Sequence, residues 1–189
     1  MTAVAIVPFM VTDAAAWRAW LDTNEESSDG VWLALAKKGT VHPTSLTYAE
    51  ALDEALCSGW IDGQKRSHDA ATFLQRFTPR RARSMWSQRN LEHVERLTRE
   101  GRIRPRGQAE IDRAQADGRW DRAYAGSATI VVPAEFEHAL NASPTARARF
   151  DALSRGERYS VLHPLVTATN DEALSRRIVK AIDRLDTGV

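Results

Sequence analysis

The segment from residue 59 to residue 90 contains the side chains whose types and spacing best fit ligand binding. It holds two Trp, seven Lys or Arg, two Gly and one Pro within 32 positions. Guanidinium groups bind phosphate or carboxylate through paired hydrogen bonds, and they also stack on aromatic rings. The segment therefore predicts a surface for a ligand that is negatively charged and partly flat.

The anion is expected to bind where this segment enters a helix, at Ser84. The backbone N–H groups of Met85, Trp86 and Ser87 would then point out of the helix end, where the helix dipole favours an anion. The Trp86 ring would stack on the ligand, and Asn90 would contact a polar edge of it. The residues expected to contact the ligand are Gln64, Lys65, Arg66, Arg76, Thr78, Arg80, Arg83, Ser84, Trp86, Ser87 and Asn90.

A structural interpretation competes with this ligand site. Ser84 is a common helix-capping residue type, and it would then serve only its own helix. The arginines would in that case pair with acidic residues from positions 1–62. Trp60 and Trp120 fit a hydrophobic core better than a stacking surface, whereas Trp86 lies inside the cationic segment. The two interpretations differ in whether the guanidinium groups between Phe77 and Met85 keep hydrogen-bonding capacity for a ligand.

The sequence shows no recognised catalytic or metal-binding motif. Acid–base chemistry would need Asp62 beside an acidic residue of positions 50–54, and that spacing matches no known signature. Cys57 lies on the apolar side of an expected helix, where a thiol is expected to be inert. The five His are not at metal-ligand spacings, and no glycine-rich nucleotide loop is present. We expect no metal and no cofactor, and a binding protein rather than an enzyme.

Charge is unevenly distributed along the 189 residues, although the formal net charge is only +1. Residues 1–62 have nine acidic and three basic side chains, which gives a net charge of −6. Residues 63–106 have twelve basic and four acidic side chains, a net charge of +8, and the remainder is −1. A basic middle segment concentrates positive potential and attracts anions.

The composition is that of a soluble protein with a sizeable core, since 43% of the residues are hydrophobic and 27% are charged. The single Cys57 excludes an internal disulfide and suits a reducing cytoplasm. The apolar opening, residues 1–11, lacks a basic flank and is too short to span a bilayer. We therefore expect a cytoplasmic protein without stable membrane insertion, and the sequence leaves its oligomeric state open.

Hydrophobic periodicity and capping residues predict an α+β fold. A small, mostly antiparallel sheet packed with helices is expected over residues 1–126, followed by a helical C-terminal region over residues 127–189. Strands are expected at residues 6–11, 31–36, 60–64 and 72–77. Helices are expected at residues 13–24, 47–58, 84–101 and 106–117, and then from Pro133, Ser143 and Asn170.

Several motifs also resemble those of a known family. They are Gly30-Val31-Trp32-Leu33, Lys37-Lys38, LTYAEALDEALCSGWIDGQ, QRFTPRRARSMWSQRN, ERLTREGRIRPRG and ADGRWDRAY. In their order and amino-acid sequence they resemble the bacteriocin-protection, YdeI/OmpD-associated family. The resembling motifs are closely spaced over about residues 13–125 and sparse in the helical tail. The resemblance implies a link to bacteriocin resistance and to outer-membrane protein regulation or stress response. It implies no settled biochemical activity and no agreed catalytic residues.

Together, the residues and the resemblance predict a non-enzymatic protein that binds an anionic ligand through a surface of Arg and Trp side chains. Two other classes stay open: a nucleic-acid (DNA) binding regulatory protein, and an enzyme acting on a phosphorylated or carboxylated small molecule. The affinity of a nucleic-acid binder would fall linearly with the logarithm of the salt concentration. A small-molecule binder would instead have a concave pocket and be stabilised by one compound.

Overall fold

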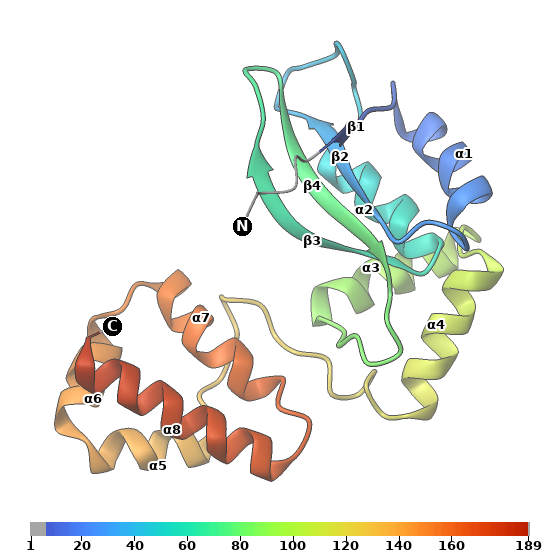
Figure 1. Cartoon of the computed structure of the whole chain (residues 1–189). Coiled ribbons are helices and arrows are strands. Elements are labelled where there is room, and N and C mark those ends of the chain that lie inside the picture. Colours follow the sequence, from blue (N-terminus) through green and yellow to red (C-terminus); the bar gives the residue numbers. More distant parts are fainter. Residues whose placement is uncertain (1–6, 189) are drawn as a thin grey trace. The chain divides into compact units, whose positions relative to one another are not determined.

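The computed structural model describes residues 7–188, which divide into two compact units. The first unit comprises the described residues up to Ser84 together with residues 90–121, and the second comprises residues 85–89 and 122–188. Strands and helices mix in the first unit, and helices alone form the regular elements of the second (Figure 1). The expected α+β class with a helical C-terminal part is confirmed. The expected domain boundary at residue 126 stays a prediction.

A four-stranded sheet forms the centre of the first unit, in the order β1-β2-β4-β3. Its strands are β1 Pro8–Phe9, β2 Val31–Ala36, β3 Trp60–Ser67 and β4 Thr72–Pro79. Antiparallel pairing joins β2 to β4 and β4 to β3, whereas β1 runs parallel to β2, so the sheet is mixed. The strand expected at residues 6–11 is only two residues long, and Ile6 lies outside the described residues. Pro8 cannot donate a backbone hydrogen bond, which suits its place in an edge strand.

The β3–β4 hairpin is longer than the sequence predicts. Both strands run eight residues, and Pro79 pairs with Trp60 at the end of β4 instead of stopping the strand before it. A bulge between Asp62 and Lys65 shifts the pairing of the two strands. The hairpin carries five of the eleven expected ligand residues, namely Gln64, Lys65, Arg66, Arg76 and Thr78.

Two amphipathic helices pack on the sheet: α1, Ala14–Asn24, and α2, Tyr48–Cys57 (Figure 1). Asp13 caps α1, and Thr47 caps α2 with a full capping box, as the sequence predicts. Trp17 of α1 contacts both Phe77 of β4 and Trp60 of β3, with ring centroids 5.8 and 6.3 Å apart. These aromatic contacts form the core that holds the hairpin.

The helix expected from Ser84 begins four residues later, as α3, Gln88–Arg99. Ser84 instead lies in a turn, where its hydroxyl accepts a hydrogen bond from the Arg81 N–H at 3.0 Å. Residues 85–87 are not helical because they pair with another segment: Tyr124 N–H donates to the Trp86 carbonyl, and Ser87 forms a bridge with Tyr124. The prediction that the N–H groups of residues 85–87 lie at the N-terminus of a helix is therefore wrong. After α3, Pro105 starts α4, Pro105–Ala116.

Four helices form the second unit: α5 Ala134–Ala142, α6 Pro144–Ala152, α7 Arg155–Val166 and α8 Asp171–Thr187. Their buried core includes Phe136, Leu140, Phe150 and Leu162. Caps at Ser143 and Asn170 confirm two expected helix starts. Helix α7 was not expected from the sequence.

Candidate functional site

A tryptophan and two arginines from three strands share one face of the sheet. Trp32 on β2 pairs with Arg76 on β4, and Arg66 on β3 pairs with Leu74 on β4. Cross-strand partners and residues two apart along a strand lie on the same face. The Arg66 guanidinium lies over the Trp32 ring, 5.1 Å from its centroid. We call Trp32, Arg66 and Arg76 the sheet-face site.

The turn before β2 supports this site. Gly30 has a φ of +116°, and a Cβ there would lie 2.4 Å from the Phe77 carbonyl oxygen and 2.7 Å from a Thr78 methyl carbon. Glycine is therefore needed for the turn to approach β4 so closely. The close approach brings the Asp29 carbonyl to Arg76, whose guanidinium donates a hydrogen bond to it at 3.3 Å. Arg76 is thus oriented by the backbone of the turn.

Ion pairing divides the basic middle segment into two parts. The four arginines at positions 96, 102, 104 and 106 each form an ion pair with an acidic residue of positions 1–62, including Asp53 and Glu54. Among the residues that the structure describes, no ion pair involves Lys65, Arg66, Arg76, Arg81 or Arg83. The acidic residues of positions 1–62 thus pair with Arg96, Arg102, Arg104 and Arg106, whereas Arg76, Arg81 and Arg83, for which the structural interpretation expected such partners, have none among the described residues.

The other expected ligand residues are dispersed. Gln64, Lys65 and Arg83 are exposed, and Thr78 and Ser84 are half-buried. Lys65 lies over the Phe73 ring at 4.3 Å. Three polar or aromatic members are buried, Arg80 at 5%, Trp86 at 1% and Asn90 at 8% exposure. Trp86 and Ser87 also belong to the second unit, whereas the rest of the expected set lies in the first.

Burial of Trp86 corrects its expected role as a stacking surface, since a ring exposed by 1% presents no face to a ligand. Trp32 is instead the half-buried tryptophan that lies beside arginines of the sheet, and sequence reasoning missed it. Its signal is weak, because a half-buried Trp in an apolar strand is typical of a sheet core. Strand register was needed to bring it beside Arg76. Whether the expected residues contact a ligand stays a prediction.

The groups considered for catalysis are engaged within the fold. Asp62 accepts a hydrogen bond from the Tyr48 hydroxyl at 2.8 Å, and Asp53 and Glu54 bind arginines. Cys57 is buried, and burial is the main cause that raises its pKa to about 11. A thiol with so high a pKa is a poor nucleophile at neutral pH. In the described part of the chain, no cluster of three His, Cys, Asp or Glu is placed to hold a metal.

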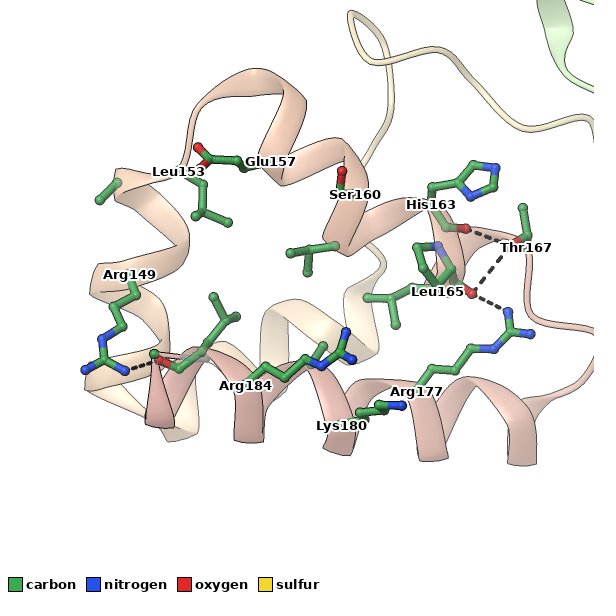
Figure 2. Close-up of a pocket in the computed structure, with 16 residues that line it drawn as sticks. Arg149, Leu153, Glu157, Ser160, His163, Leu165, Thr167, Arg177, Lys180 and Arg184 are labelled. Carbon is green, nitrogen blue, oxygen red and sulfur yellow. Dashed lines mark hydrogen bonds between the residues drawn. The ribbon is translucent and has the colours of Figure 1, made fainter. Parts of the chain in front are cut away.

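The second unit contains a cavity of about 1100 Å³ between α6, α7 and α8 (Figure 2). Its walls combine apolar side chains with four cationic ones, at positions 149, 177, 180 and 184, and one acidic one, Glu157. Sequence reasoning missed this cavity because it did not predict α7, which forms one wall. The capping-box pair Ser154 and Glu157 was the available signal for that helix.

Comparison with protein-family models gives two separate matches. Residues 9–110 match a domain of unknown function (DUF8412), and residues 129–188 match the family described as bacteriocin-protection, YdeI or OmpD-associated. The first match covers more than half of the chain, so the chain belongs to that family, and its C-terminal segment is similar to the second family. No curated protein and no solved structure gave a match to the chain. None of the helices between residues 7 and 188 combines the length and the apolar character needed to cross a membrane.

The positions of the matches correct one expectation about the resemblance. The bacteriocin-protection, YdeI or OmpD-associated match covers α5–α8, where the sequence resemblance was expected to be loose. The motifs that suggested the family lie mostly in the segment matched by the domain of unknown function. The family prediction is confirmed, but the matched segment is the helical tail. The sheet-face site and the α6–α8 cavity therefore lie in segments of different families.

Proposed function

We propose that this bacteriocin-protection, YdeI or OmpD-associated protein binds an anionic ligand at the sheet-face site without transforming it. The observation that carries the proposal is the division of the basic segment. Arg96, Arg102, Arg104 and Arg106 pair with acidic residues of positions 1–62, whereas Arg66 and Arg76 have no carboxylate partner among the described residues. A cytoplasmic location and a role in stress response belong to the same proposal.

Spare hydrogen-bonding capacity at Arg76 supports anion binding. A guanidinium has five N–H donors, and within the described residues Arg76 uses one of them, for the Asp29 carbonyl. Phosphate and carboxylate accept paired hydrogen bonds from the remaining donors. Because the turn already orients Arg76, the ordering cost of binding is lowered.

The Trp32–Arg66 pair favours an anion that also has a planar group. The Arg66 guanidinium lies over the Trp32 indole and presents a flat cationic surface. A planar ring of the ligand can stack on this surface, next to the half-buried Trp32. Nucleotides combine such a ring with a phosphate. We therefore expect a nucleotide-like ligand, with its phosphate at Arg76 and its ring near Trp32 and Arg66.

Adenosine monophosphate is the probe for this proposal, titrated by calorimetry into the full chain. Arg66→Ala and Arg76→Ala are each expected to weaken its affinity about tenfold, the size of one lost hydrogen bond to a charged group. The matched control is Arg99→Ala, which removes an exposed cation of α3 that has no ion pair among the described residues. The control is expected to bind like the wild type. Absence of saturable binding, or equal losses in all three variants, would contradict the proposal.

Nucleic acid is the second candidate, favoured by the exposed Arg81 and Arg83 in the turn after β4. A single strand contacting these cations as well as the sheet-face site would neutralise several phosphates. Its observed affinity would then fall steeply with the logarithm of salt concentration. A labelled single-stranded oligonucleotide measured at several salt concentrations distinguishes the two cases, because a mononucleotide gives a much shallower slope.

A further inference from the structure

We propose that the α6–α8 cavity is a second binding site, specific for a small amphipathic anion with one carboxylate or phosphate head and a flexible apolar chain. This site goes beyond the sheet-face proposal, because it lies in the other unit and uses other residues. The cavity volume of about 1100 Å³ reaches the upper end of the range for small-molecule sites. It has room for a medium-length acyl chain.

The cations of the cavity fall into two pairs. Arg149 donates to the Leu185 carbonyl at 2.6 Å, and Arg177 donates to the Pro164 carbonyl, so each has a structural partner. Lys180 and Arg184 have neither a side-chain hydrogen bond nor an ion pair among the described residues. Figure 2 shows Arg184 reaching from α8 into the space between α7 and α8.

Helix geometry places Lys180 and Arg184 close enough to bind one anionic group. Lys180 and Arg184 are four residues apart on α8, so they lie on the same helix face about 5–6 Å apart at Cβ. Two cations at this spacing can bind the same carboxylate or phosphate head. The only acidic lining residue, Glu157, is engaged elsewhere, since it accepts a hydrogen bond from the Ser154 N–H at 2.8 Å. Because four cationic side chains face one carboxylate, the lining keeps a net positive charge.

Apolar side chains next to these cations favour a ligand that has an apolar chain beside its anionic head. Leu153 and Val161 are half-buried on the cavity wall, and Ala181 of α8 also lines the cavity. A fully hydrated anion such as phosphate would leave this wall exposed to water, whereas an acyl chain would cover it. Charge at one wall and apolar surface beside it together favour an amphipathic acid over an inorganic ion.

Decanoate, below its micellar concentration, is the probe for this site, titrated into the full chain by calorimetry. The double variant Lys180→Gln/Arg184→Gln is expected to lower the affinity at least tenfold. The matched control is Arg155→Gln/Arg176→Gln, which removes the same charge from exposed positions of the same unit outside the cavity. The control is expected to change the affinity less than twofold. Val161→Thr, which keeps the side-chain shape but replaces a methyl with a hydroxyl, is expected to weaken binding several-fold.

Ligand analogues separate the two halves of the recognition. Decanol lacks the charge and acetate lacks the chain, and each is expected to bind at least tenfold more weakly than decanoate. The proposal is overturned if the wild type does not bind decanoate, or if the control variant loses as much affinity as the cavity variant. Binding to phosphatidylglycerol vesicles without binding to free decanoate also overturns it. Unchanged adenosine monophosphate binding by the cavity variant keeps this test separate from that of the sheet-face site.

Discussion

At the residue scale, the environment of the His163 side chain lowers its pKa and so makes the stability of the fold depend on pH. Its ring lies 4.6 Å from the Tyr124 ring and 5.3 Å from the Tyr159 ring, measured between centroids. Burial is the main cause that lowers the pKa of His163 below its usual value of 6.5, and the charge of Arg177 lowers the pKa further. The folded protein therefore holds this imidazole neutral, at the end of α7 that Arg177 caps.

The pH dependence follows from this lowered pKa. Below about pH 6.5 the unfolded chain binds a proton at His163 before the folded protein does, so the free energy of unfolding falls as the pH falls through this window. Well above the ordinary pKa of 6.5 both states are deprotonated at this residue, and its contribution to the pH dependence disappears. His163→Phe is expected to flatten the profile between pH 7 and pH 5, measured by denaturant unfolding at each pH. Parallel profiles for the wild type and the variant would contradict the assignment.

At the element scale, a network of ion pairs joins α2 to α3 and to the α3–α4 connection. Glu54 is its centre, since it accepts hydrogen bonds from Arg102 at 2.7 Å and from Arg104, and its side chain is only 9% exposed. Glu54→Gln is expected to cost at most about 3 kcal/mol, because two partly buried guanidinium groups lose the carboxylate they share, while Arg102 keeps Asp53 and Arg104 keeps Asp22. The free energy of unfolding, followed by tryptophan fluorescence, measures this loss.

An exposed ion pair provides the comparison for this network. Glu172 pairs with Arg176 on α8, and both side chains are largely exposed. Glu172→Gln is expected to change stability by less than about 0.5 kcal/mol, since solvent screens such a pair. A loss for Glu54→Gln that is no larger than about 0.5 kcal/mol would show that the α2 network does not stabilise the first unit.

Local signals made some elements predictable and left others hidden. The caps at Asp13, Thr47 and Asn170 form hydrogen bonds within three residues, so the sequence alone indicates where α1, α2 and α8 begin. The start of α3 depends on Trp86 and Ser87 pairing with distant Tyr124, which no local pattern reveals. Helix α7 was missed because Pro164 within it resembles a helix end.

At the scale of the whole molecule, the sequence predicted a cationic ligand surface, whereas the fold decided which cations remain available for it. The charge asymmetry was visible from composition, but the partners of Arg102 and Arg104 depend on the packing of α2 against the α3–α4 connection. The place of Trp32 beside Arg76 depends on strand register, which the sequence does not specify. The α6–α8 cavity required three helices, one of them unforeseen. Tertiary pairing thus separates the structural arginines from the candidate ligand residues.

Arginine side-chain NMR tests this separation most directly. In a titration of the labelled protein with adenosine monophosphate, the Nε–H signals of Arg66 and Arg76 are expected to shift and saturate together. The signals of Arg102 and Arg104, held by Glu54, are expected to stay in place. Saturable shifts confined to the first pair would support ligand binding at the sheet-face site. Shifts of Arg102 and Arg104 alone, or none at Arg66 and Arg76, would contradict it.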